Sequence, residues 1–391
     1  MKNAFLRNNL LCILFAVAVF SCSRKINDRL MVIDTAQSPD GKISFLGDIA
    51  ENVEYIPLQT SKESLISYIY DIKTTNNKVY IKSLNEIICF YETGEFFSRL
   101  SSKGRGPGEY QSIYDFDINS DNDQIAILSS RKIHLYIVRG EKYLYSKSLN
   151  CIFQPGNIDF TPGRNNIFLT YSSYGNEPFR NLLINSEGDT LNSRPNFFKF
   201  TKIGGLNLAM PDENIIYTYN GEIHFKEMFC DTVFSLDKDN NIKPHFVLDS
   251  HGKRPTAKAR AETEFFITQL PKYIRVVKIF EVSRYLIYKF HYERAQSYSI
   301  SDKVLNKRFE VNSGTLFKDD ISGGIDFEPK FCSDEKLYSW VEALKLKNYV
   351  SSPSFENSVV RNPEKKLALK NLADSLKETD NPVLIVVTPK K

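Results

Sequence analysis

The chain has 391 residues, a formal net charge of +4 and 42% apolar side chains, and its aromatic residues include 21 Tyr and 28 Phe. This near-neutral charge lacks the clustered basic character of a nucleic-acid-binding domain, so we expect no nucleic-acid partner. The length exceeds the ~250–300 residues of one ordinary hydrophobic core, unless the fold is built from repeats. The many aromatic residues favour β-strands.

The first 21 residues have the layout of a secretory signal peptide. Lys2 and Arg7 precede an unbroken apolar run from Leu10 to Phe20. The run is too short to cross a bilayer, which takes ~20 apolar residues. A positive start followed by a short apolar segment and small residues is typical of a leader that is removed. We therefore assign residues 1–21 to a signal peptide.

The end of this leader resembles the lipobox of bacterial lipoproteins. In Val19-Phe20-Ser21-Cys22, cleavage before the cysteine leaves Cys22 as the lipidated first residue. The resemblance implies a lipidated tether over residues 22–42 and a cell-envelope location, on the periplasmic side or at the cell surface. Contact with the membrane would then be made through the lipid anchor only. The alternative is an ordinary leader with an incidental cysteine.

The remaining cysteines form no recognisable framework. They are Cys89, Cys151, Cys230 and Cys332. They lie far apart without a Cys-x-x-Cys pair, and the five histidines are also scattered, so the sequence predicts no zinc site. We expect unpaired thiols that act as small hydrophobic side chains.

Two markers recur along the rest of the chain at a similar interval. A glycine turn recurs at Thr93-Gly94-Glu95, Arg139-Gly140-Glu141 and Glu187-Gly188-Asp189. An aspartate inside an apolar run recurs at Asp71, Asp115 and Asp159, and the pattern returns at Asp326. A period of ~40–50 residues with several short strands in each unit is the signature of a β-propeller.

Counting the units predicts an all-β protein, a six-bladed β-propeller over residues 43–391. The strand-like segments include Lys78–Ile81, Gln124–Leu128, Ile215–Tyr217, Arg284–Phe290, Ile325–Phe327 and Leu337–Trp340. A propeller must close its ring, because an open sheet edge promotes aggregation. We expect Ile43–Phe45 or Val53–Leu58 to complete the last blade beside Val383–Val387.

Two stretches interrupt the rhythm of the strands. Residues 256–270 read as a helical insertion, with Thr256 as its cap and several alanines inside it. Residues 363–377 read as a second helix, because Asn362-Pro363 places a cap and a first-turn proline in their preferred positions. Its apolar face is expected to pack on the rim of the propeller.

The segment Gly104-Arg105-Gly106-Pro107-Gly108-Glu109-Tyr110 predicts a rigid connector between two blades. Lys103, Arg105 and Glu109 form a candidate face loop that would present charge to a ligand. In the alternative interpretation, Glu109 accepts a hydrogen bond from a backbone amide or pairs with a neighbouring base, and the glycines only shape the turn.

This connector, together with Val53–Leu58 and Asp380–Leu384, resembles the markers of the six-bladed, NHL-like β-propeller lipoproteins of Bacteroidetes bacteria. The resemblance covers nearly the whole mature chain and implies a fold and an envelope location. It implies no settled activity, since fold alone does not determine function.

Six side chains are candidates for a ring around the central channel. They are Asp71, Asp115, Asp159, Asn207, Arg275 and Asp326. Clustered carboxylates raise one another's pKa or recruit a cation, so the channel is predicted to bind a cation or a polyhydroxylated ligand, chiefly through Asp115 and Asp159. Calcium is the one candidate metal, because it takes oxygen ligands of this kind; otherwise no cofactor is expected. Alternatively, these carboxylates bind backbone amides between blades.

The sequence therefore favours a binding or protein-interaction module over an enzyme. The expected partner is a glycan, a peptide or another envelope protein. The alternative is a metal-dependent hydrolase or lyase that uses the central channel. No nucleophile elbow, P-loop or dinucleotide fingerprint is present, and no catalytic residue is assigned.

Overall fold

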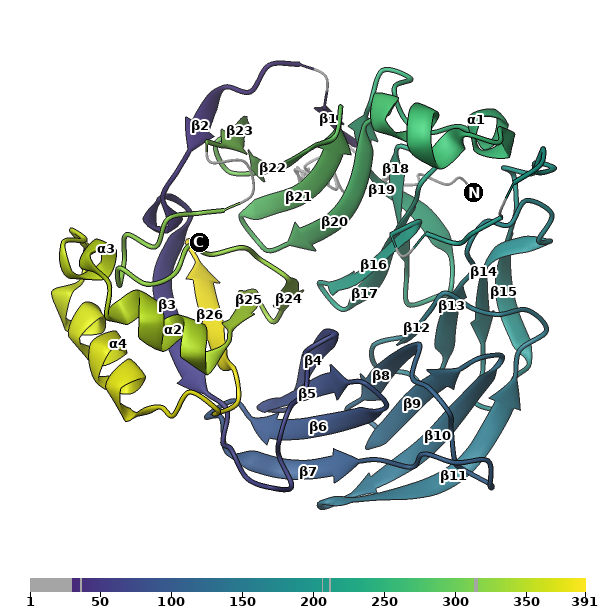
Figure 1. Cartoon of the computed structure of the whole chain (residues 1–391). Helices are drawn as coiled ribbons and strands as arrows, with labels where there is room; N and C mark the ends of the chain where they lie inside the picture. Colours follow the sequence, from purple (N-terminus) through teal and green to yellow (C-terminus); the bar gives the residue numbers. More distant parts are fainter. Residues whose placement is uncertain (1–29, 36, 206, 211, 313–315) are drawn as a thin grey trace, which may run out of the picture.

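A computed structural model describes residues 30–391 except 36, 206, 211 and 313–315. Six β-sheets are arranged around a central channel, so the prediction of an all-β, six-bladed propeller is confirmed (Figure 1). The expected signal peptide, residues 1–21, and the expected lipidation site Cys22 lie outside the described residues. Among the described helices, none combines the length and the apolar composition that a membrane crossing requires.

Each blade is built from consecutive antiparallel strands, and the innermost strand comes first. Blade one contains β4 (Asp71–Thr75), β5 (Lys78–Ser83), β6 (Glu86–Tyr91) and β7 (Phe96–Leu100), and blade two contains β8 (Asp115–Asn119), β9 (Gln124–Ser129), β10 (Lys132–Arg139) and β11 (Lys142–Asn150). Blade three contains β12 (Asn157–Phe160), β13 (Ile167–Thr170), β14 (Phe179–Ile184) and β15 (Thr190–Pro195), and blade four contains β16 (Asn214–Tyr219), β17 (Glu222–Glu227), β18 (Thr232–Leu236) and β19 (Ile242–Asp249). Blade five contains β20 (Arg275–Glu281), β21 (Tyr285–Tyr292), β22 (Ala295–Asp302) and β23 (Lys307–Val311).

Blade six combines the two ends of the chain and closes the ring. It contains β24 (Phe331–Ser333), β25 (Lys336–Val341), β26 (Val383–Pro389) and β3 (Ala50–Pro57). The register pairs Val53 with Val387 and Pro57 with Val383. This is the closure expected of Val53–Leu58 beside Val383–Val387. The strand from the N-terminal part of the chain, β3, and the last strand, β26, are thus paired in one sheet.

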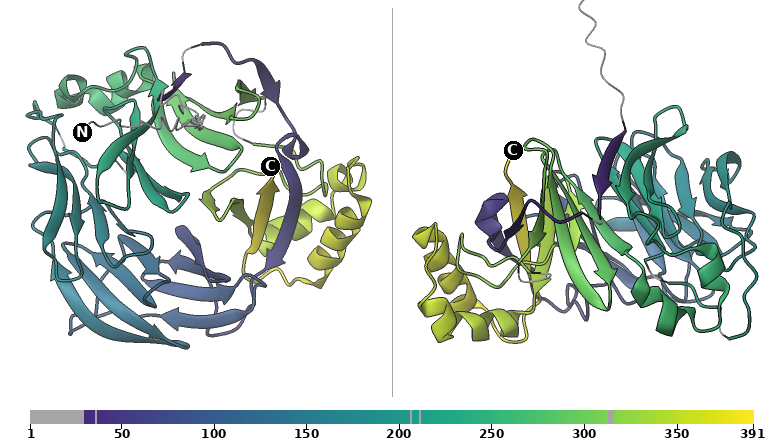
Figure 2. Two further views of the ribbon diagram at one scale, coloured as in Figure 1. Left: turned by 180° about the vertical axis from the view of Figure 1, so that it is seen from behind. Right: turned by 90° about the horizontal axis from the view of Figure 1, so that it is seen from above.

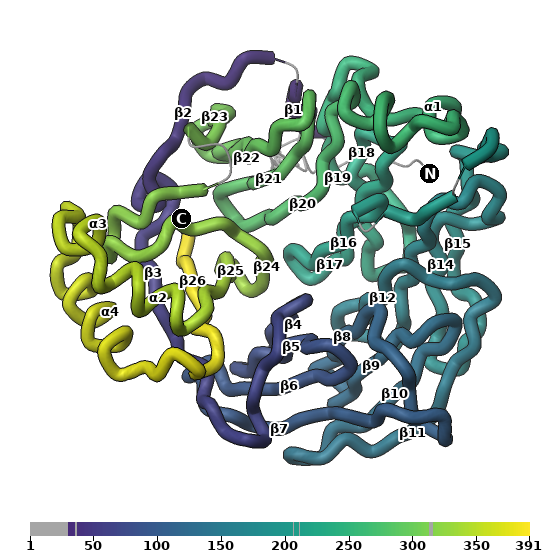
Figure 3. Tube along the Cα trace, in the orientation of Figure 1, coloured from purple at the N-terminus to yellow at the C-terminus, as the bar shows by residue number. Residues whose placement is uncertain are grey.

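The segment before β3 lies along the outside of the ring (Figure 3). Strand β1 (Met31–Asp34) adds in parallel to β19 of blade four, and β2 (Gly41–Ile43) adds in parallel to β23 of blade five. A short 3-10 turn, η1 (Leu46–Asp48), then leads into β3. Half of the described residues of the expected tether, residues 22–42, therefore belong to the sheets.

Middle strands are apolar on both faces because each blade packs between two others. In β6, the four residues Ile87, Ile88, Cys89 and Phe90 are all fully buried. Ile88 and Phe90 pack with side chains of blade six, whereas Ile87 and Cys89 pack with side chains of blade two. Successive residues of a strand point to opposite faces, so one continuous apolar run serves two interfaces.

The helix predicted over 256–270 is broken in the structure. Thr256 caps α1 (Ala257–Ala261) by accepting a hydrogen bond from the amide of Ala259, as expected. The chain becomes extended at Glu262 and continues as a π-turn, η2 (Phe265–Gln269), and a 3-10 turn, η3 (Leu270–Lys272). The break places Phe265 in full burial, and packing of this kind overrides the weak preference of alanines for one continuous helix.

The second predicted helix is confirmed as α4 (Pro363–Ser375), with Asn362 capping the amide of Lys365. Two further helices, α2 (Ala343–Val350) and α3 (Pro353–Glu356), were not predicted. All three lie beside blade six, and their buried residues join its core. They form a helical lobe between β25 and β26.

The antiparallel strand order gives the disc two unlike faces (Figure 2). The hairpin face carries the turns that follow the inner strands, including residues 76–77, 120–123, 220–221 and 334–335. The opposite connector face carries the links between blades, the helical lobe and the α1–η3 insertion. Because β1 runs parallel to β19, Met31 lies at the hairpin face, as does the end of β26.

The glycine-proline connector joins β7 to β8 on the connector face. Gly108 has φ +76°, and a Cβ placed there would lie 2.5 Å from Cγ of Tyr145. Gly106 has no positive φ, and a Cβ there would meet only the end of the Glu109 side chain. The expectation of a constrained turn is therefore met at Gly108 and not at Gly106.

We expect Gly108→Val to lower the free energy of unfolding by about 1–3 kcal/mol, because valine is strained at positive φ and meets the Tyr145 ring. Gly106→Val should cost less. Glu109→Gln should change little, since the amide oxygen can still accept the hydrogen bond from Gly106 N. Chemical denaturation measures the free energy of unfolding of the three variants. An equal decrease in all three would contradict the expected order.

Candidate functional site

The central channel holds a cavity of about 1080 Å³ that reaches all six inner strands. Its lining is mainly polar and contains nine carboxylates and three lysines. The carboxylates are Asp71, Asp115, Asp117, Asp121, Asp159, Asp212, Glu281, Asp334 and Glu335, and the lysines are Lys73, Lys278 and Lys330. This excess of negative charge agrees with the expectation of an acidic channel.

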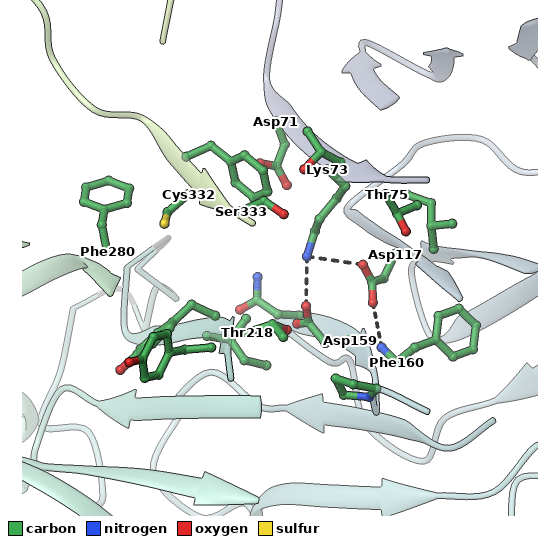
Figure 4. A pocket seen from close by; sticks show the side chains of 18 of the residues that line it. Asp71, Lys73, Thr75, Asp117, Asp159, Phe160, Thr218, Phe280, Cys332 and Ser333 are labelled. Carbon is green, nitrogen blue, oxygen red and sulfur yellow. Dashed lines mark hydrogen bonds and ion pairs between the residues drawn. The ribbon is translucent and has the colours of Figure 1, made fainter. Parts of the chain in front are cut away.

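Lys73 is the centre of the charged cluster in this cavity (Figure 4). Its Nζ lies 2.8 Å from Oδ1 of Asp159 and 3.5 Å from Oδ1 of Asp117. Lys73 comes from blade one, Asp117 from blade two and Asp159 from blade three. One ammonium group therefore links three successive blades across the channel.

In this cluster one ammonium group, that of Lys73, faces two carboxylates, those of Asp117 and Asp159. Burial lowers the pKa of Lys73, but Asp159 and Asp117 outweigh this effect and hold it well above its usual range. Burial raises the pKa of Asp159 to about 8; Lys73 opposes this rise, whereas Asp117 and Asp115 add to it. Burial also raises the pKa of Asp117, against the effect of Lys73. The lysine stays protonated while the carboxylates compete for it.

Asp115 and Asp117 also connect neighbouring blades through the backbone. Oδ2 of Asp115 accepts a hydrogen bond from the amide of Ile158 at 2.9 Å, and Oδ2 of Asp117 accepts one from the amide of Phe160 at 2.7 Å. Burial raises the pKa of Asp115 to about 6, and Lys73 opposes this rise. The alternative prediction, in which these carboxylates bind backbone between blades, therefore describes Asp115. It does not describe Asp159, which is turned toward Lys73.

The structure brings three of the six predicted ring residues to the cavity. Asp71, Asp115 and Asp159 begin or occupy the inner strands of blades one to three, as the repeat predicted. The other three are not among its lining residues, although Arg275 begins the inner strand β20, as expected. Asn207 precedes β16 and donates to the carbonyl of Tyr174, Arg275 forms an ion pair with Asp212 at 2.7 Å, and Asp326 precedes β24. The repeat length varies where loops are inserted, so the period that gave Asn207 falls short of β16. Asp326 repeats the sequence pattern of the markers but lies in the loop before β24.

Lys73 and Asp117 were not predicted, although a signal for them exists. They follow Asp71 and Asp115 by two residues, and residues two apart in a strand lie on the same face. The residues two positions after the markers Asp71 and Asp115 are Lys73 and Asp117, so the same strand faces predict both.

A second buried polar cluster lies between blades four and five and was also missed. Oε2 of Glu281 accepts a hydrogen bond from the hydroxyl of Tyr217 at 2.8 Å and lies 3.0 Å from Nε2 of His245. Nζ of Lys303 lies 3.3 Å from the other oxygen of Glu281. Burial raises the pKa of Glu281, but the contacts with His245 and Lys303 outweigh it and lower the pKa. Its partners come from strands far apart in the chain, so sequence spacing gives no sign of it.

The face-loop residues Lys103, Arg105 and Glu109 do not reach this cavity. Oε2 of Glu109 accepts a hydrogen bond from the amide of Gly106 at 2.7 Å. This is the backbone contact that the alternative interpretation gave to Glu109. The loop is shaped locally, on the connector face.

The four predicted unpaired thiols, Cys89, Cys151, Cys230 and Cys332, are free cysteines. Within the part of the chain that the structure describes, no three His, Cys, Asp or Glu side chains are grouped so that they could hold a metal ion. Calcium needs six to eight oxygen ligands. The carboxylates around Lys73 are already engaged by an ammonium group or by backbone amides, so the calcium hypothesis gains no support from their arrangement.

We expect the wild-type protein to lose stability between about pH 5 and about pH 8 because of Asp159. Its pKa in the folded state, about 8, lies above the value of about 3.9 in an unfolded chain. The folded state therefore binds this proton more tightly, and the resulting stabilisation is lost as pH rises through the folded pKa. Asp159→Asn does not titrate, so its loss over this interval should be smaller by on the order of 2 kcal/mol.

Chemical denaturation at both pH values measures this difference. Asp239→Asn is the matched control, because it removes the same charge at an exposed turn outside the cavity. Equal losses of stability in Asp159→Asn and in the wild type would show that Asp159 does not titrate in this interval.

Comparison with known proteins identifies solved structures that are similar to most of this chain. A crystal structure of a candidate exported protein from Bacteroides fragilis matches at 17% identity with a TM-score of 0.68, over 90% of this chain and 99% of that chain. A member of the DUF4221 family from Bacteroides vulgatus matches at 14% identity with a TM-score of 0.48, over 87% of this chain and 97% of that one. No curated protein matches.

A family model described as a domain of unknown function, DUF4934, matches residues 31–388. The match begins at β1 and ends in β26, so it covers every blade as well as the strands added outside the ring. The chain therefore belongs to the DUF4934 family.

Proposed function

We propose that the protein is a cell-envelope lipoprotein, anchored through Cys22, whose NHL-like propeller binds a ligand in its central cavity. The main support for this proposal is the size of the central cavity. Ligand pockets commonly measure about 300–1,000 Å³, and the volume of about 1080 Å³ is sufficient for a glycan chain or a peptide segment. Six blades contribute to its lining, so a ligand there would contact the whole ring.

Two further observations support an envelope binding protein. The first 22 residues have the pattern of a leader that ends in a lipobox-like Cys22, and the similar structure from Bacteroides fragilis is that of a candidate exported protein. The hydrolase or lyase alternative has less support, because the described residues offer no grouped metal ligands. We therefore favour binding over catalysis.

We expect Cys22→Ser to move the protein from the membrane fraction to the soluble fraction, because the lipid would be its only membrane contact. Fractionation followed by immunoblotting measures this. Cys12→Ser is the matched control, since Cys12 lies in the leader that is removed. Unchanged membrane association of the Cys22 variant would refute the anchor.

Binding in the cavity predicts that a bulky side chain blocks it. Thr218 is exposed and lies in the cavity wall (Figure 4). We expect Thr218→Trp to abolish binding of ligands found on glycan and peptide arrays, without lowering the melting temperature. Thr190→Trp, at an exposed position of the outer strand β15, should bind as the wild type does. Ligands that bind both variants equally would place recognition outside the channel.

A further inference from the structure

We propose that the cavity takes a ligand that carries alkylammonium groups, with Asp159 as its contact inside the channel and the carboxylates of the hairpin face at its mouth. This inference rests on the proposed function and names the chemical class of its ligand. It follows from three separate features of the cavity: an unused acceptor, an excess of carboxylates and an acidic rim.

The unused acceptor is Oδ2 of Asp159. The residue is 5% exposed, and its Oδ1 accepts from Lys73. Oδ2 is buried and has no hydrogen-bond partner among the described residues. Buried carboxylate oxygens are normally satisfied by donors. Asp159 lines the cavity, so a rotation of its carboxylate would turn this oxygen toward a ligand N–H group, which would supply the missing donor.

The excess of carboxylates persists after the internal contacts are assigned. Lys73 is the ammonium group of the cluster and is shared by Asp159 and Asp117. The other two lysines of the cavity are engaged at blade six. Lys278 donates to the carbonyl of Lys330, and the ammonium of Lys330 lies 4.1 Å from the ring centroid of Trp340. Positive charge for Asp159 beyond that of Lys73 must therefore come from protons or from a ligand.

The acidic rim lies at the hairpin face, where the inner strands end. Asp121, Asp334 and Glu335 are exposed there and line the cavity. Each accepts a hydrogen bond from a backbone amide or a serine hydroxyl: Gly163 N to Asp121, Ser333 Oγ to Asp334 and Ser283 N to Glu335. None of the three forms an ion pair with a described Lys, Arg or His side chain. Carboxylates around an opening attract cations from solution.

An alkylammonium group fits these features better than a metal ion does. It needs only a few acceptors and donates up to three hydrogen bonds, whereas a calcium ion needs at least six oxygen ligands. A neutral ligand would satisfy Oδ2 of Asp159 but leave the excess charge. Two sources share the required chemistry, namely a free polyamine and the lysine side chains of a basic peptide.

Titration calorimetry at about pH 9, where Asp159 with its pKa of about 8 is ionised, tests the inference with spermidine and trilysine as probes and separates the two sources. We expect at least one probe to bind at low ionic strength and to bind more weakly as salt is added. Asp159→Asn should weaken binding by about tenfold or more, because a charged hydrogen bond is lost. Asp239→Asn, which removes the same charge outside the cavity, should bind as the wild type does.

A double variant of the rim, Asp121→Asn with Glu335→Gln, provides a second test that does not depend on a buried substitution. Both positions are exposed, so folding should be preserved, and affinity for the probe should fall. Absence of heat with both probes at about 1 mM, or equal affinity of Asp159→Asn and Asp239→Asn, would overturn the inference. A neutral oligosaccharide that binds the wild type and not Thr218→Trp would then leave the proposed function standing.

Discussion

Closure of the ring between β3 and β26 is the constraint on which the rest of the structure depends. Each blade is a β-sheet whose two faces are covered mainly by the neighbouring blades, so the apolar residues of its middle strands are buried only when the blades are assembled. The pairing of Val53 with Val387 joins the first and last thirds of the chain in one sheet. Once the ring is closed, the inner strands are held at fixed positions around the channel.

The channel shows what this constraint does to charged groups. Inner strands from three blades bring Lys73, Asp117 and Asp159 together, although these residues lie far apart in the sequence. Removal from water makes the charged forms of the carboxylates costly, and one lysine cannot neutralise all of them. The resulting cavity is acidic because of the fold, and not because the chain as a whole carries negative charge.

Much of the fold could be predicted because blades repeat a local pattern. The alternation of strands and glycine turns defines each unit, and the markers Asp71, Asp115 and Asp159 fall on successive inner strands. The pattern fails where a blade departs from the average length. Asn207 lies in the long loop before β16 and Asp326 in the loop before β24, so neither residue is on an inner strand. The Glu281 cluster depends on contacts between blades, which spacing along one chain does not encode.

The added strands β1 and β2 have a mechanical consequence. If the N-terminus is attached to a surface, a pulling force first meets β1 on blade four, then β2 on blade five, and reaches the closing strand β3 last. Since β1 runs parallel to β19, tension directed along the two strands would shear several hydrogen bonds at once and not open them one after another. The pairings of β1 and β2 would thus bear the force before it reaches β3, and the ring would stay closed while the N-terminus is pulled.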